Sequence, residues 1–370
     1  FLTPVGLCPS VSMDSAIKKE FDRCEEDGLC RSDVAGLRMK WIKGKKHMIA
    51  QYHPTWQLVK RKPYFARPSM TEPFSHDAFN FTKVKEPEVL AKYYVDKGKV
   101  CFVDKSTSEN PEGVSVLYTI LLNVSPICNN HHLIIPNLSA CYPQIWRYEL
   151  TEDLLTMCVN SERDDYVLFF NSLGGFSSVN HLHFQVMYTS SFYATAASQP
   201  DPPFTSRFSP NKLPLEYARS AERCSVPLPE EEDACVSISE VHDWLSQTIK
   251  FKLEGKKSYT AADRHVMAEC FNELIRACYD FSYPYDVIMC NHGEEMYVFV
   301  RRYQKSLDTI RVNPACVELT GIVVYRSEEA FDHADEEVLL NLCKKEVYFP
   351  GETWEAFIRA YIDRMNNKDI

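Results

Sequence analysis

The sequence predicts an α+β protein built from two related halves. Between His181 and Val186 polar and apolar residues alternate strictly, which is the pattern of a half-buried strand. Between Ala261 and Tyr279 apolar residues recur at three- and four-residue spacing, which is the stripe of a buried helix. From Val236 onward the helix-and-strand order of the first part starts again, although no fixed-period repeat is visible. The 370 residues also exceed the roughly 250–300 residues of a single core, so two subdomains or domains are expected.

Composition and charge exclude several classes of protein. The formal charge of −10 argues against a general nucleic-acid binder, which needs a basic surface, although a local basic pocket could still bind a small anion. The 14 cysteines are scattered without a C-x-x-C pair, which indicates a reducing compartment, and we expect a cytoplasmic location. The N-terminus lacks the basic region of a signal peptide. No apolar run reaches the roughly 18 residues of a membrane helix.

The stretch from Asn171 to Tyr188 carries the candidate chemistry. Its glycines and serines form an approach segment that can expose backbone N–H groups to an anion. In the strand that follows, one face is apolar and the other carries His181, His183 and Gln185. Such a histidine pair can be catalytic, can bind a metal, or can be a hydrogen-bonded part of the core. Gln185 favours an anion site, because an amide is a poor metal ligand but a neutral donor to phosphate oxygens.

Local patterns predict the elements of the first half. Asp14 to Asp27 is charged and is predicted as a helix. Met39 to Gln51 has a lysine-rich tip between apolar runs, which predicts a hairpin. Phe79 to Val84 is compact and aromatic, which predicts a strand. The other expected elements are an apolar segment at Val114–Val124 that stops at Ser125-Pro126, a strand at His131–Pro136 that stops at its proline, a helix at Tyr148–Val159 and a buried strand at Tyr166–Phe170.

The second half follows a segment of different composition. Residues 189–212 are rich in serine, proline and small residues, which predicts a flexible surface loop, and a charged connector comes next. An amphipathic helix is then expected around Val241–Phe251, before the long helix. Strands are expected at Tyr285–Cys290, Met296–Val300 and Gly321–Tyr325, and helices at Val338–Cys343 and Trp354–Met365. The predicted division is an N-terminal half at 1–188, a loop and connector at 189–235 and a C-terminal half at 236–370.

Taken together, several segments resemble the GDP-hexose phosphorylases, a branch of the histidine-triad superfamily close to the galactose-1-phosphate uridylyltransferases. The string NSLGGFSSVNHLHFQ, from Asn171 to Gln185, is the most specific of them. The others follow in the family's order: Arg31–Val34, Val59–Arg67, Phe79–Val84, Asn123–Ile127, His131–Pro136 and Val317–Gly321. The resemblance covers most of the chain and implies a histidine-triad-like antiparallel sheet flanked by helices. It also implies a nucleotidyltransferase that converts GDP-D-glucose and phosphate into GDP and glucose 1-phosphate, with GDP-L-galactose as the alternative substrate.

The same resemblance implies roles for the candidate residues. His183 stands at the position of a nucleophile that forms a covalent guanylyl-histidine, from which inorganic phosphate releases GDP. His181 would orient His183, Gln185 would hold phosphate oxygens, and His131 would fix the tautomer of the nucleophile. The candidates for contacts with phosphate or ribose are Asn171, Gly174, Ser178, Lys83 and Arg67. No metal ion and no cofactor is expected, and the partners are a GDP-hexose and inorganic phosphate, with a homodimer as an open alternative.

The chain departs from the family pattern in places, and alternatives remain open. Asn130-His131 stands where the family has Gly-His. Gly321-Ile322 replaces a second Gly-His, which weakens the case for a catalytic histidine in the second half. Residues 189–211 interrupt the pattern as an insertion. A nucleotide hydrolase of the same superfamily is one alternative, although such hydrolases carry a third histidine where this chain has Gln185. A catalytically silent nucleotide- or metal-binding protein is another, and no residue identifies the base.

Overall fold

The computed structural model describes residues 12–32, 34–59, 69–197 and 209–367. Its strands form an eleven-stranded sheet and a three-stranded sheet. In spatial order the large sheet contains β4 (Lys99–Val103), β3 (Val89–Asp96), β5 (Tyr118–Leu122), β6 (His132–Pro136), β8 (Phe184–Tyr188), β7 (Tyr166–Asn171), β12 (Tyr285–Cys290), β13 (Glu295–Val300), β11 (Gln247–Glu254), β10 (Cys235–Val241) and β9 (Ser220–Pro227). The small sheet contains β1 (Arg38–Trp41), β2 (Ile49–Tyr52) and β14 (Ile322–Tyr325).

The two halves of the large sheet have the same topology. In each half three strands are followed by a helix and two more strands, and the last strand lies between the third and the fourth. The helix is α3 (Thr151–Asn160) in the first half and α5 (Ala261–Asp280) in the second. The halves join where β7 pairs antiparallel with β12, with Asn171 opposite Asp286. The prediction of two related halves is therefore confirmed, and β4 is an addition outside β3.

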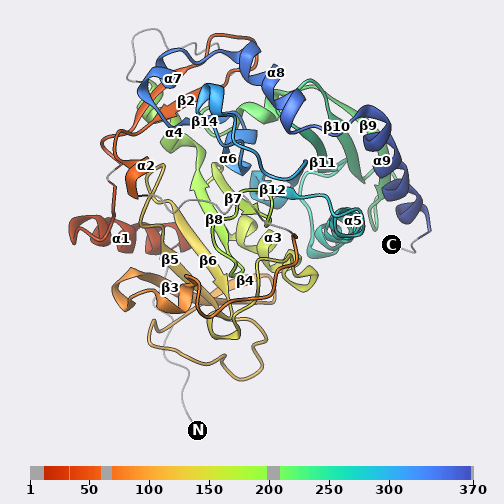
Figure 1. The fold of residues 1–370 in the computed structure, drawn as a ribbon. Helices are drawn as coiled ribbons and strands as arrows, with labels where there is room; N and C mark the ends of the chain where they lie inside the picture. Colours follow the sequence, from red (N-terminus) through yellow and green to blue (C-terminus); the bar gives the residue numbers. More distant parts are fainter. Residues whose placement is uncertain (1–11, 33, 60–68, 198–208, 368–370) are drawn as a thin grey trace.

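Helices and the small sheet cover opposite faces of the large sheet. On one face α1 (Met13–Glu26), α3, α5 and α9 (Gly351–Asn366) bury their apolar side chains against it. On the other face the small sheet packs with α2 (Trp56–Val59), α4 (Thr189–Ala197), α6 (Cys316–Leu319), α7 (Glu328–Asp332) and α8 (Glu336–Glu346). In Figure 1, α7, α8 and β14 lie together at the top, and α5 and α9 lie to the right. None of the described helices has the length and apolar composition needed to cross a bilayer.

Short 3-10 turns connect these elements. They are η1 (Phe81–Lys83), η2 (Glu86–Glu88), η3 (Leu138–Ala140), η4 (Tyr148–Leu150), η5 (Pro214–Tyr217), η6 (Asn291–Gly293) and η7 (Asp308–Ile310). Most longer elements were predicted correctly: α1, the β1–β2 hairpin, β6, α3, β7, α5, β12, β13, β14, α8 and α9. The apolar segment expected at Val114–Val124 contains β5. The long helix α5 begins where the Thr260 side chain accepts the Asp263 N–H, a capping box that fixes its first turn.

The predicted amphipathic helix around Val241–Phe251 is wrong. This segment leaves β10 and forms most of β11, because Ile249, Phe251 and Leu253 alternate with lysines and face the core with strand periodicity. Pairing with β10 and β13 on either side then favours the strand over any helical tendency. The sheet of the second half also begins earlier than predicted, since β9 lies inside the expected connector.

Three other segments differ from the prediction. Phe79–Val84 contains the 3-10 turn η1 instead of a strand, because the Asn80 side chain accepts the Thr82 N–H and caps the turn. The expected loop from 189 begins with helix α4, whose Phe192 side chain is buried, and residues 198–208 lie outside the described residues. Strand β8 begins only at Phe184, so both histidines of the central motif precede it.

Candidate active site

His183 is held in one orientation by its own backbone neighbourhood. Its N–H donates to Gln144 Oε1 (2.9 Å), and its ring Nδ1 lies 2.7 Å from the carbonyl oxygen of His181. A carbonyl can only accept, so Nδ1 carries the proton and the neutral ring keeps its lone pair on Nε2. His183 is 8% exposed and lines a cleft. A preoriented imidazole in this tautomer can act as a nucleophile without a separate base.

Behind His183, a hydrogen-bond chain fixes the amide of Gln185. The backbone N–H of Ile127 donates to His131 Nδ1 (3.3 Å), and the Asn123 side-chain amide lies 3.0 Å from His131 Nε2. That nitrogen lies 3.0 Å from Gln185 Oε1, and Gln185 Nε2 donates to Asn171 Oδ1 (3.2 Å). The carbonyl side of Gln185 therefore faces His131 and its amide nitrogen faces Asn171. In the structure His131 contacts Gln185, whereas its expected role was to fix the tautomer of His183.

The series of hydrogen bonds that fixes Gln185 continues into the second half of the protein through Asn171. Its side chain donates to Gly175 O (2.9 Å) and to Asp286 Oδ1 (3.1 Å) on β12. Asp286 forms a fully buried ion pair with Arg301 (3.2 Å). Burial raises the pKa of Asp286 to about 7, and the neighbouring Arg301 guanidinium opposes this rise. The position of the Gln185 amide thus depends on contacts that cross the β7–β12 junction.

The cleft in front of His183 lies between the large sheet and the small-sheet layer. Both halves of the chain line it. The first half supplies Arg31, Trp56, Phe81, Asn123, Val124, Ser125, Ile127, His131, Leu133, Asn171, Phe176, Ser177, Ser178, Val179, His183 and Gln185. The second half supplies Asn313, Ala315, Val317, Glu318 and Val324. Among these lining residues the second half contributes no histidine, in line with the loss of its Gly-His motif.

His181 lies beside the cleft instead of lining it. Its Nδ1 accepts the Phe81 N–H (3.1 Å), and its ring packs between Phe74 and Phe81 at centroid distances of 5.1 and 5.5 Å. Burial, and to a smaller extent the neighbouring His183, lowers the pKa of His181 to about 4. His181 is therefore neutral, and its backbone carbonyl, not its ring, contacts His183.

The other sequence-predicted residues fall in different places. Ser178 lines the cleft, whereas Gly174 (φ +84°) packs away from it, against Tyr303 and Pro284 of the second half. Lys83 lies in a neighbouring pocket, and its ammonium donates to the backbone carbonyls of residues 76–78. Arg67 lies outside the described residues.

Comparison with known proteins places the chain in a family. A family model described as GDPGP1-like, N-terminal domain, matches residues 12–187, and one described as GDPGP1-like, C-terminal domain, matches residues 217–367. The chain belongs to the GDPGP1-like family. Two relatives with similar sequences are GDP-hexose phosphorylases by name. GDP-L-galactose phosphorylase 2 of Arabidopsis thaliana is 24% identical over 89% of this chain and 71% of its own length. GDP-D-glucose phosphorylase 1 of Xenopus laevis is 29% identical over 50% of this chain and 52% of its own length.

The fold of the GDPGP1-like chain also has a solved counterpart. The yeast Ap4A phosphorylase Apa2, in complex with Ap4A, superposes with a TM-score of 0.55 at 13% identity, over 92% of this chain and 99% of the Apa2 chain. The similarity confirms the predicted fold, an antiparallel sheet flanked by helices.

Sequence reasoning missed several residues of the GDPGP1-like cleft. Arg31 is the one cation among the described lining residues, and Gln144 holds His183 from the loop between η3 and η4. Asn313 and Glu318 reach the cleft from the segment between β13 and β14. Arg31 and Glu318 stand in segments that follow the family's order, which is the only signal the sequence offers for them. Gln144 and Asn313 carry no such signal.

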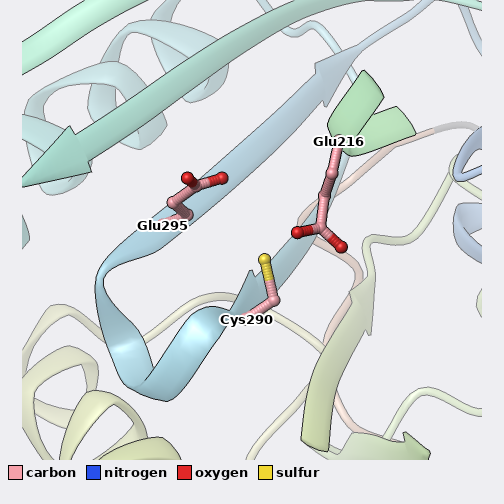
Figure 2. A group of neighbouring side chains, drawn as sticks. All are labelled: Glu216, Cys290 and Glu295. Carbon is pink, nitrogen blue, oxygen red and sulfur yellow. The ribbon is translucent and has the colours of Figure 1, made fainter. Parts of the chain in front are cut away.

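One group of potential metal ligands lies away from the cleft of this GDPGP1-like chain. Glu216, Cys290 and Glu295 have ligand atoms within 4.8 Å of one another, and Figure 2 shows the Cys290 sulfur pointing toward the Glu216 carboxylate. The carboxylates already have partners: Glu216 accepts from Leu213 N–H and Asn291, and Glu295 accepts from Tyr297 and pairs with Lys250. Burial raises the pKa of the Cys290 thiol well above its usual value, which disfavours the thiolate that a metal requires. The group is therefore explained by internal hydrogen bonds.

Proposed function

We propose that this chain catalyses the phosphorolysis of a GDP-hexose, with GDP-D-glucose as the first candidate and GDP-L-galactose as the second. The observation that carries the proposal is the tautomer of His183, whose Nδ1 proton faces a carbonyl and whose ring lines a cleft beside the fixed amide of Gln185. The similarity to GDP-D-glucose and GDP-L-galactose phosphorylases supports this substrate class. The hexose stays a proposal because relatives of both kinds match the chain.

The reaction proceeds in two displacements at the α-phosphorus. His183 Nε2 forms a bond to this phosphorus, the bond to the oxygen bridging the β-phosphorus breaks, and hexose 1-phosphate leaves with that oxygen. An oxygen of inorganic phosphate then attacks the same phosphorus, and the bond to His183 breaks. The products are GDP, whose β-phosphorus comes from inorganic phosphate, and regenerated His183. No external oxidant, reductant or metal ion enters this scheme.

Gln185 suits transfer to phosphate better than hydrolysis. A sugar phosphate has a second pKa of around 6, like other phosphomonoesters, and leaves without protonation by a third histidine. The Gln185 amide is held between His131 and Asn171, so its remaining N–H can be presented to a phosphate oxygen without reorganisation. Arg31 is placed to balance phosphate charge, and it takes the role expected of Lys83.

The test uses purified protein with GDP-D-glucose, GDP-L-galactose, GDP-D-mannose and UDP-glucose, each with and without ³²P-labelled phosphate. We expect GDP and hexose 1-phosphate only when phosphate is present, with the label in the β-phosphate of GDP. Release of GMP without phosphate would identify a hydrolase instead. His183→Asn should abolish turnover and the transfer of label into GDP, while the exposed His242→Asn serves as the matched control.

We also propose a cytoplasmic location. All 13 cysteines in the described part of the chain are free thiols, which suits a reducing compartment. Localisation of the tagged full chain by fractionation tests this.

A further inference from the structure

The side chain of Arg301, the residue that follows β13, joins two elements of the second half. It is 1% exposed, and its Nη1 donates both to Asp286 Oδ2 (3.2 Å) and to the backbone carbonyl of Pro314. Its Nε donates to the carbonyl of Arg302 (3.3 Å), which helps to set the plane of the guanidinium group. A single buried nitrogen thus links β12 to the segment between β13 and β14.

Both acceptors of this nitrogen lead to residues that line the cleft. Asp286 Oδ1 accepts the side-chain N–H of Asn171 (3.1 Å), and Asn171 Oδ1 accepts from Gln185 Nε2 (3.2 Å). Both sequence neighbours of Pro314 line the cleft. Arg301 is not among the lining residues, so it acts on the cleft only through these partners.

A third part of the wall, the loop that follows β7, contacts Arg301 through Phe176. The guanidinium carbon lies 4.9 Å from the centroid of the Phe176 ring, which lines the cleft. Phe176 has a φ of +72°, a backbone conformation that a bulky residue keeps only when its surroundings impose it. Its N–H donates to Gln304 Oε1 (2.7 Å), so side chains of the second half hold this loop at both its ring and its backbone.

We propose that Arg301 is a positioning residue that favours transfer of the guanylyl group to phosphate over transfer to water. The proposal rests on the proposed function for the reaction. A phosphate acceptor must be held by fixed donors such as the Gln185 amide, whereas water is small and attacks from many positions. Without the guanidinium, Asn171 and Gln185 lose their support, so attack by phosphate slows more than attack by water.

The two outcomes differ in their products. When a phosphate oxygen bonds to the α-phosphorus and the bond to His183 breaks, the product is GDP. When a water oxygen does so, the products are GMP and a proton. The ratio of GMP to GDP therefore reports how well the cleft positions the phosphate acceptor.

The experiment measures this ratio at fixed phosphate concentration, together with KM for phosphate. Neither quantity depends on the fraction of the enzyme that is folded, so a loss of stability alone moves neither. Arg301→Lys keeps a positive charge near Asp286, but its side chain is shorter and has no planar group to lie over Phe176. We expect it to raise the ratio and KM by about tenfold each. Arg264→Lys, on α5, is the matched control, because Arg264 also donates to a backbone carbonyl, that of Tyr259 (2.9 Å).

A second variant serves if Arg301→Lys fails to fold. The double variant with Arg301→Met and Asp286→Asn removes both charges of the ion pair, so no buried charge is left unpaired. It keeps an acceptor for the Asn171 amide but has no donor for the Pro314 carbonyl. We expect the same rise in the ratio of GMP to GDP and in KM for phosphate.

Binding of GDP separates this proposal from the proposed function. Titration calorimetry with GDP alone needs no turnover, and the dissociation constant does not depend on the folded fraction. GDP binding about tenfold weaker in Arg301→Lys than in the wild type supports the positioning role, even if no GDP-hexose is consumed. A wild-type ratio and a wild-type KM for phosphate in an active variant overturn the proposal. In the absence of wild-type turnover, an unchanged affinity for GDP overturns it.

Discussion

At the scale of single residues, the chemistry depends on which nitrogen of His183 carries the proton. The carbonyl of His181 places this proton on Nδ1. The backbone at His183 is held in turn by Gln144, whose side chain accepts the His183 N–H and donates to Asn171 O (2.9 Å) and His183 O (3.1 Å). A side chain that bridges the ends of β7 and β8 in this way acts as a positioning residue. It contacts the nucleophile's backbone and not the substrate.

Gln144→Ala should therefore lower kcat by about 10- to 100-fold with little change in KM, because a small displacement of the nucleophile lengthens the attack distance. Steady-state kinetics on the GDP-hexose that the wild type prefers measures this. Gln247→Ala is the matched control, because Gln247 bridges the N–H and carbonyl of Phe349 far from the cleft. Equal losses of kcat in the two variants would show that Gln144 has only a structural role.

His132 makes stability depend on pH. Its Nδ1 donates to Asn130 O (2.8 Å), and complete burial lowers its pKa to about 4 from an ordinary 6.5. Between pH 6.5 and 4 the unfolded chain therefore binds a proton at His132, whereas the folded chain does not. The contribution of His132 thus lowers the free energy of unfolding as the pH falls through that range. In urea unfolding, the difference in free energy between wild type and His132→Phe should shift by about 2 kcal/mol in favour of the variant from pH 7 to pH 4.5. A pH-independent difference would contradict the assignment, and exposed His333→Phe controls for removing a histidine.

At the scale of elements, the positions of the residues that line the cleft depend on the junction where β7 pairs with β12. The loop after β7 passes Asp286 so closely that a Cβ on Gly175 would lie 2.4 Å from Asp286 Oδ1 and 3.0 Å from Ser172 Oγ. Asp286 cannot move freely, since Asn171 and Arg301 hold it. The glycine is required here by space, not by its backbone angles.

Gly175→Ala should destabilise the protein by roughly 1–3 kcal/mol, as overpacking of a buried site does, and should lower kcat by displacing Asn171 and hence Gln185. Chemical denaturation and kinetics measure the two effects. Gly351→Ala at the start of α9 is the control, because nothing lies within 4 Å of the added methyl group. Full activity with unchanged stability in Gly175→Ala would show that the junction tolerates movement.

The sequence predicted what depends on local pattern and missed what depends on long-range pairing. Alternation around His183 correctly predicted a strand with Phe184 and Val186 buried, because strand periodicity is local, but both histidines precede that strand and are themselves buried. The helix expected at Val241–Phe251 failed because neighbours distant in sequence decided its conformation. Glu318 could not be placed in the cleft, since it comes near His183 only through the pairing of β7 with β12 and of β2 with β14.

At the scale of the whole molecule, the two halves share a topology but are not structurally independent of each other. The large sheet runs through both halves, and both major cores draw residues from each of them. The small sheet pairs β2 of the first half with β14 of the second in parallel. Every residue of β7 and of β12 is buried, so separating the halves would expose two apolar strand edges.

The chain should therefore unfold as one cooperative unit. We expect fluorescence and circular dichroism to give coincident urea transitions, and the calorimetric enthalpy to equal the van't Hoff enthalpy. Residues 1–208 and 209–370, produced separately, should each aggregate or lack a cooperative transition, because β7 or β12 then lies at an open edge and Asp286 loses its bond to Asn171. Activity should return only when the two fragments are produced together, since His183 and Glu318 lie in different fragments but line the same cleft. A cooperative transition in either isolated fragment would show that the halves are independent domains, and the junction would then be a docking interface that forms after each half has folded.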